Sequence, residues 1–399
     1  MAPEIVIILT AVLVAVPSAL VGSFLVLRKM AMIGDAISHA VLPGIVIAFF
    51  LAGGPAPIPV LIGAAALGLL TVTLVEALYR SRLVKEDAAI GLVFPALFAF
   101  GVYLVSAYGG RVHIDTQHVL YGEIAYAPWD ILMVGDVVLG PKSLWVLGSV
   151  TALILGFVFI FYKELKVASF DPGLATSLGF SPILVHYLLM SAVSLTTVAA
   201  FDSVGAILVV ALLIVPPATA YLLTDRLSVM LGLAVGIGSL SAVIGYLLAR
   251  SLDGSIAGAM ATVAGLLFGL AAVASPRYGV LAWLVRQARL RREFAADLLI
   301  AHLGQREYRE ARSGDAVGAS MSMATPAPGN TPIADLQARF RWSDRFTQSV
   351  IRQVSAAGLI RFASRETGEN GIQDAGVANS NGVVLTDSGR SRAAELIAQ

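Results

Sequence analysis

An aspartate and a histidine stand four residues apart in an otherwise apolar segment of the chain. Asp35 and His39 lie within the stretch GDAISHAVLPG, residues 34–44. If this stretch is helical, positions i and i+4 share one face, so both side chains project in the same direction. A carboxylate and an imidazole together suit a first-row divalent ion such as Mn²⁺, Fe²⁺ or Zn²⁺. The pair is therefore a candidate metal site.

The same residues also have a purely structural interpretation. Gly34 and Asp35 can begin a helix, since Asp is a common N-cap, and a neighbouring hydroxyl can satisfy His39. These residues alone favour neither interpretation. A tight metal site needs more than two ligands, and a second copy across a twofold axis is the simplest source of the others. Pro43 lacks the N–H that would bond the carbonyl of His39, so a helix break is expected beside the pair.

The composition places these residues in a membrane. The chain has 399 residues, of which 57% are hydrophobic and only 13% are charged. Such values are typical of a polytopic membrane protein and exclude an ordinary soluble globular one. The chain has no cysteine, which excludes disulfides and thiolate metal sites.

Nine apolar runs are long enough to cross a bilayer, which takes about 20 residues. They lie near residues 5–27, 30–53, 57–79, 88–108, 143–162, 183–200, 204–223, 228–249 and 256–274. Short loops on one side hold eight Lys and Arg residues, and those on the other side hold three. The positive-inside rule then predicts an N-terminus outside and a cytoplasmic C-terminal part. Asp202 leaves almost no loop between two spans, and a re-entrant helix there would invert the orientation downstream, which the basic tail disfavours.

A short helix is predicted between the fifth and sixth spans, in FDPGLATSLGFSP, residues 170–182. Asp171 is a good N-cap, a proline follows it at the first helical position, and Gly179 suits the exit. Leu174 and Leu178 share one face, with Phe170 beside it. That apolar face must pack on something, and from these residues alone lipid or the chain's own bundle is the favoured surface. Farther along, Pro216 and Pro217 predict a kink or break in the span over 204–223.

The segment RKMAMIGDAISHAVLPG resembles the signature of the membrane subunits of bacterial metal-ion ABC importers, the manganese, zinc and iron permease (ABC-3) family. The resemblance covers residues 5–275 and implies an all-α fold of the type II ABC importer kind in the bacterial inner membrane. It implies that Asp35 and His39 bind the metal within the membrane. The form SHAVLPG is closer to the manganese and iron members than to the zinc permeases, which favours Mn²⁺ as the transported ion.

The same resemblance implies several partners. FDPGLATSLGF is similar to the coupling helix that docks into the ATPase subunit of such importers, through Phe170, Asp171, Leu174, Ala175, Leu178 and Gly179. The chain holds no GxxxxGK[ST] motif, so it is not an enzyme and ATP is hydrolysed by a separate chain. An extracytoplasmic metal-binding protein and a second permease, identical or a paralogue, are also implied, and no permanently bound cofactor is expected.

The last part of the chain differs in composition. From residue 286 to 399 there are 15 Arg and 12 Asp or Glu, about half of all charges. This division predicts a permease domain over 1–285 and a cytoplasmic domain over 286–399, with a linker or mobile loop over 311–331. The order of helix, helix-turn-helix, strand and last helix resembles a small α+β winged helix-turn-helix domain of the iron-dependent repressor kind.

The role of this tail is less determined than its fold. Four arginines could line a recognition helix and contact phosphates: Arg339, Arg341, Arg345 and Arg352. The tail carries a net charge of only +3 and is tethered to a membrane, which disfavours DNA binding. We expect a regulatory or assembly role instead.

Two other functions compete with metal import. A related permease for a metal chelate, such as a siderophore or cobalamin, predicts a wide apolar cavity and has no need of Asp35 and His39. A membrane-tethered regulator would act through the tail alone, would need no coupling helix, and would use nine spans only as an anchor.

Overall fold

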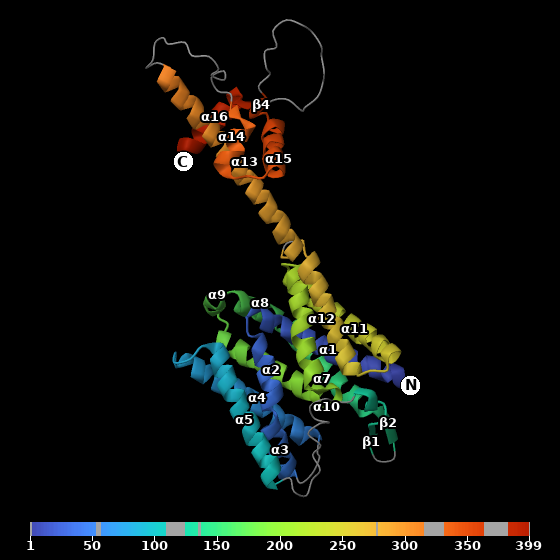
Figure 1. Ribbon diagram of the computed structural model, residues 1–399. Helices are drawn as coiled ribbons and strands as arrows, with labels where there is room; N and C mark the ends of the chain where they lie inside the picture. The colour runs from blue at the N-terminus through green and yellow to red at the C-terminus, as the bar shows by residue number, and fades with distance from the viewer. Residues whose placement is uncertain are drawn as a thin grey trace. The chain divides into compact units, whose positions relative to one another are not determined.

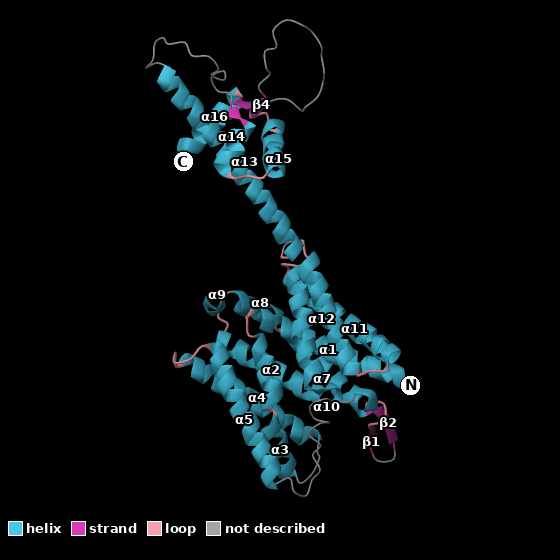
Figure 2. Ribbon diagram, in the orientation of Figure 1, coloured by secondary structure: helices cyan, strands magenta, loops and turns pink. Residues whose placement is uncertain are grey.

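The computed structural model of the chain describes residues 2–52, 57–108, 124–134, 137–276, 278–314, 331–362 and 382–398. The chain forms two compact units, Met1–Ala282 and Trp283–Gln399. The domain boundary expected from the sequence, between residues 285 and 286, lies three residues farther along. The first unit consists mainly of long apolar helices (Figures 1 and 2).

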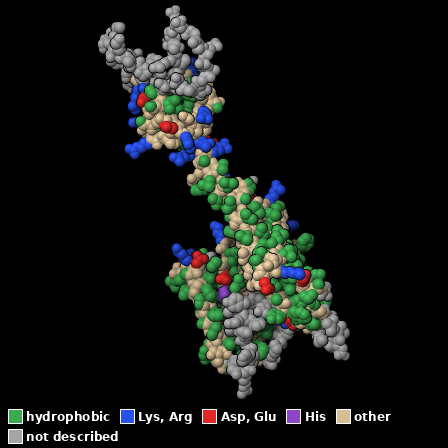
Figure 3. Space-filling model, turned by 45° about the vertical axis from the view of Figure 1, so that its right-hand side comes forward, with side chains coloured by type: hydrophobic (Ala, Val, Ile, Leu, Met, Phe, Trp, Pro, Cys, Tyr) green, Lys and Arg blue, Asp and Glu red, His purple; other side chains and the backbone are tan. Residues whose placement is uncertain are grey.

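The helices of the first unit follow the apolar runs of the sequence. They are α1 (Pro3–Leu27), α2 (Ala31–Ala40), α3 (Leu42–Ala52), α4 (Pro57–Arg80), α5 (Glu86–Tyr108), α7 (Lys142–Ile160), α8 (Tyr162–Phe170), α9 (Pro172–Ser177), α10 (Pro182–Leu223), α11 (Leu227–Leu252) and α12 (Ile256–Ala274). Nine stretches of the described residues are long and apolar enough to span a membrane, because α2 and α3 together form one span and α10 contains two. The nine predicted spans are therefore confirmed. The visible surface of this unit is mainly hydrophobic (Figure 3).

A β-hairpin precedes α7 in the same unit. A single 3₁₀ turn, Ile124–Tyr126, leads into strands β1 (Ile131–Val134) and β2 (Val137–Pro141), which pair antiparallel. The sequence pattern did not predict these two short strands.

Helix α1 packs against α7, α10 and α11. It passes α10 closely at Gly22, where an added Cβ would clash with the carbonyl oxygen of Leu213. Pro217 has no N–H, so the Leu213 carbonyl lacks its usual partner within the helix. A glycine is therefore needed where α1 passes this free carbonyl.

The interruption of α10 lies at Gly205 and not at the proline pair. Gly205 has φ 75° and ψ 166°, a conformation open essentially to glycine alone, and it lies near the start of the second of the two spans in α10, Ser203–Leu223. Pro216 and Pro217, where the sequence predicts a kink or a break, lie inside the helical stretch that follows, and that stretch is not interrupted at them. A proline φ near −65° is compatible with a helix, and only the hydrogen bonds to residues four positions earlier are lost.

The second unit contains helices and one small sheet. Its elements are α13 (Val280–Gly314, which begins at the end of the first unit), β3 (Thr331–Pro332), α14 (Ile333–Phe340), α15 (Asp344–Ala356), β4 (Ile360–Phe362), β5 (Gly382–Leu385) and α16 (Asp387–Ala398). The strands are antiparallel in the order β3–β5–β4. Of the linker expected over 311–331, the first four residues belong to α13, residue 331 begins β3, and 315–330 lie outside the described residues.

An apolar core holds this second unit together. Leu299, Ile300 and Leu303 of α13 meet residues of α14, α15 and the sheet there. The other buried members of this core include Leu336, Val350, Ile351, Val354 and Ile360. Leu359 is partly buried against the same core.

Candidate metal and coupling sites

Asp35 and His39 lie on one face of α2, one helical turn apart. Asp35 Oδ1 is 3.4 Å from His39 Nε2, and the two side chains are 35% and 34% exposed. The opposite face of α2 packs against other helices of the chain. Ile37 is buried there, close to Gly68 of α4 and Ser194 of α10. The acid–histidine face is therefore the face of α2 that remains accessible.

The depth of the pair follows from the start of the helix. At 1.5 Å per residue, Asp35 and His39 lie about 6 Å and 12 Å from Ala31, the first residue of α2. They belong to a span that covers residues 31–52. Ionisable side chains at such a depth are costly in lipid and face a partner or an aqueous pathway. Beside His39, the ring of Phe94 from α5 lies at a centroid distance of 5.9 Å.

The span breaks close to the pair. Helix α2 ends at Ala40 and α3 begins at Leu42, so Pro43 lies in the first turn of α3. Helix α5 packs closely here, since a Cβ at Gly101 would lie 2.8 Å from the Cδ of Pro43. Irregular backbone at this depth is tolerated where it is buried in protein or lines a cavity.

Helix α9 has the local structure that its sequence indicates. Asp171 caps it, with Oδ1 accepting a hydrogen bond from the N–H of Leu174 at 3.0 Å, and Gly179 leaves it at φ 86°. Phe170, Leu174 and Leu178 are 60%, 49% and 56% exposed. By contrast, Ala175 is buried in the core of the first unit. The helix is thus anchored on one side and presents an apolar surface on the other.

A polar cluster joins α4 to α10 and was not expected from the sequence. Glu76 accepts hydrogen bonds from Arg80 at 2.6 Å and from the hydroxyl of Tyr187 at 2.9 Å. His186 Nε2 lies 3.9 Å from the same carboxylate. Glu76 and Tyr187 are 111 positions apart, so no local pattern could reveal the contact.

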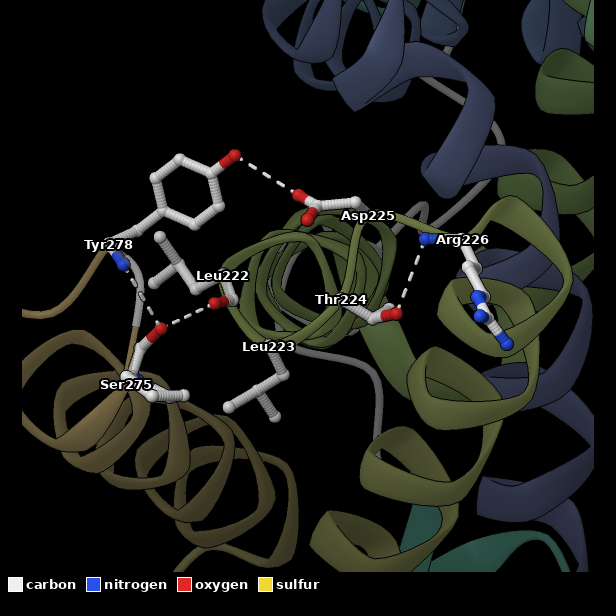
Figure 4. A pocket seen from close by; sticks show the side chains of 8 residues that line it. Leu222, Leu223, Thr224, Asp225, Arg226, Ser275 and Tyr278 are labelled. Atoms are coloured by element: carbon white, nitrogen blue, oxygen red, sulfur yellow. Dashed lines mark hydrogen bonds between the residues drawn. The ribbon is translucent and has the colours of Figure 1, made fainter.

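A pocket of about 350 Å³ lies where α10 and α12 end (Figure 4). The Tyr278 hydroxyl donates to Asp225 Oδ1 at 3.0 Å, and the Ser275 hydroxyl donates to the Leu222 carbonyl at 2.6 Å. These contacts join the two helix ends. Neither Asp35 nor His39 lines this pocket, so the candidate metal pair lies elsewhere in the molecule.

Known proteins resemble this chain in sequence and architecture. Residues 5–275 match the ABC 3 transport family. The chain is 54% identical over 289 residues to the manganese transport system membrane protein MntD of Bacillus subtilis, covering 72% of this chain and 98% of that protein. It is 46% identical over 311 residues to the zinc transport system membrane protein TroD of Treponema pallidum, covering 77% and 83%.

A solved structure agrees with these relatives. PsaBC from Streptococcus pneumoniae in complex with Fab has a TM-score of 0.60 and 32% identity, covering 71% of this chain and 95% of that one. The family match spans more than half of the chain and includes the accessible Asp35–His39 face and α9. The chain belongs to the ABC 3 transport family.

Proposed function

We propose that this chain is the membrane subunit of an ATP-driven importer of divalent transition metal ions, with Mn²⁺ as the favoured substrate and Fe²⁺ or Zn²⁺ as alternatives. The observation that carries the proposal is the Asp35–His39 pair, one-third exposed at membrane depth on the accessible face of α2. The relatives named for manganese and zinc transport support the substrate class.

The pair supplies half of a metal site. Among the described residues, no group of three or more His, Cys, Asp and Glu could hold a metal ion. A second permease, a copy or a paralogue, that presents the same face across a twofold axis would contribute another Asp and His. Four such ligands suit a first-row divalent ion. The accessible face of α2 is then the dimer interface as well as the pathway.

The other components of the proposed importer are separate chains. An ABC ATPase subunit would dock on the exposed apolar side of α9, and an extracytoplasmic metal-binding protein would deliver the ion. This assigns α9 and the second unit to the cytoplasm of a bacterium and the N-terminus to the outside, as the basic loops indicate. The metal is cargo, and no permanently bound cofactor is proposed.

The test is transport by the complete complex. Proteoliposomes holding this permease, its partner permease and the ATPase, supplied with the binding protein, should take up Mn²⁺ when ATP is present on the ATPase side. An ATPase carrying a substitution in its nucleotide site is the control. Uptake of a metal chelate in place of the free ions would refute the proposal.

We further propose that the second unit is a winged-helix module with a regulatory or assembly role. The strand order β3–β5–β4 with α14 and α15 before β4 supports the fold. Deletion of residues 290–399 should then weaken assembly of the complex or change its response to metal, as measured by copurification and uptake. An intact, normally regulated complex that has lost only DNA binding would contradict this role.

A further inference from the structure

A hydrogen bond joins the segment before the Asp35–His39 pair to the segment before α9. Arg28 caps the end of α1, and its Nε donates to the hydroxyl of Ser169 at 3.0 Å. Arg28 is three residues before the start of α2, which carries Asp35 and His39. Ser169 is the penultimate residue of α8 and is followed directly by Phe170 and the N-cap of α9. The two partners are 141 positions apart in the chain.

The corner that carries Arg28 is stiff. The N–H of Lys29 bonds the carbonyl of Val26 at 3.1 Å, and the N–H of Met30 bonds that of Leu25 at 2.9 Å. Together with the left-handed φ of 61° at Lys29, this is a Schellman motif, which closes the end of a helix. The backbone between Arg28 and the start of α2 is held by these bonds, so we expect a displacement of the Arg28 side chain to move the start of α2.

The segment that carries Ser169 is equally constrained. The N–H of Asp171 bonds the carbonyl of Val167 at 2.9 Å, so α8 runs directly into the capped start of α9. Leu165 and Ala168 bury one side of α8 in the core of the first unit. We therefore expect a movement of α9 to displace Ser169.

Part of the Arg28 guanidinium is buried. Burial lowers the pKa of Arg28 below its ordinary value, and among the described residues its Nη2 has no hydrogen-bond partner. Burying a cation without full pairing is unfavourable, whereas the neighbouring Lys29 has the same charge and is exposed. The sequence therefore retains a partly buried cation at this position, and its Nε is bonded to the hydroxyl of Ser169, next to α9.

We propose that the Arg28–Ser169 hydrogen bond links α9, the proposed coupling helix, to α2, which carries Asp35 and His39. Movement of α9 driven by the ATPase then displaces the start of α2 and opens the Asp35–His39 site. Arg28 acts as a positioning residue and does not touch the metal. The inference rests on the proposed function, and it assigns the transmission step to one pair of side chains.

The experiment measures Mn²⁺ uptake and ATP hydrolysis in the same proteoliposomes of the complete complex. Arg28→Gln and Ser169→Ala should each lower the Mn²⁺ transported per ATP by about fivefold, the lower end of typical coupling between sites. Copurification of the ATPase and equilibrium Mn²⁺ binding should stay at the wild-type level. Because both changes remove the same bond, the double variant should be no worse than either single one.

Two matched control variants distinguish loss of the Arg28–Ser169 hydrogen bond from nonspecific effects of substitution in these segments. Lys29→Gln removes a neighbouring positive charge without touching Ser169, and Ser169→Thr keeps the hydroxyl; both should retain the wild-type ratio. A wild-type ratio of Mn²⁺ transported per ATP hydrolysed in Arg28→Gln and Ser169→Ala overturns the inference. A parallel loss of equilibrium Mn²⁺ binding also overturns it, because it would reveal a merely structural role. Wild-type complexes that take up none of Mn²⁺, Fe²⁺ and Zn²⁺ would instead refute the proposed function.

Discussion

Replacement of Asp35 or His39 by alanine is expected to lower ATP-dependent Mn²⁺ uptake by at least about 100-fold, since even the outer partners of metal ligands contribute 10–100-fold in affinity. Each substitution removes two ligands at once in a symmetric dimer, one from each copy, and leaves a pair that cannot replace the hydration shell of the ion. Equilibrium Mn²⁺ binding to the complex in detergent should fall with uptake, while ATPase copurification stays normal.

Ser38 offers a matched control for this pair. It lies on the same helix between the two residues, and its hydroxyl donates to the Gly34 carbonyl at 2.9 Å. Ser38→Ala removes a polar group from α2 without removing a proposed ligand, so uptake should stay within about twofold of wild type, as expected for the loss of one modest hydrogen bond. Normal transport by both Asp35→Ala and His39→Ala would show that the metal is bound elsewhere.

The double substitution Leu174→Ala and Leu178→Ala is expected to weaken ATPase binding by more than about 30-fold, the loss typical of central apolar anchors at protein interfaces. Both side chains are about half exposed on α9, so their truncation costs the isolated permease little. The permease should remain folded, bind Mn²⁺ normally and no longer copurify with the ATPase.

Leu83 is the control for nonspecific loss of surface apolarity. It is 86% exposed in the turn between α4 and α5, so Leu83→Ala should leave copurification unchanged. Asp171→Ala provides a graded test, because loss of an N-cap costs a helix about 1 kcal/mol and should weaken the complex without abolishing it. Full ATPase binding by the leucine double variant would place the docking surface outside α9.

The long apolar spans were predictable because their cause is local. Each span must satisfy its own backbone hydrogen bonds and present apolar side chains to lipid over about 20 residues, so it is visible in any hydropathy window. The same holds for α9, whose cap, proline and exit glycine are adjacent in the chain, and for Asp35 and His39, whose common face follows from the period of a helix. The strand hairpin before α7 lacked such a period and was missed.

Contacts between distant segments could not be predicted in this way. The α4–α10 polar cluster around Glu76 and the Arg28–Ser169 bond join residues more than 100 positions apart. The interruption of α10 at Gly205 has a related cause. Prolines mark where backbone hydrogen bonds are lost, but the helix continues through Pro216 and Pro217, where Gly22 of α1 leaves room for the Leu213 carbonyl, and the non-helical residue is Gly205.

By itself, the sequence determined the number of spans, the helical face shared by Asp35 and His39, and the capped helix that carries Leu174. These features depend on residues within a few turns of one another. Only the tertiary structure decided which face of α2 stays accessible, because that depends on Gly68 and Ser194 packing against Ile37. It also decided that the segment before the metal pair is bonded to the segment before α9, a contact created by the folding of the whole unit.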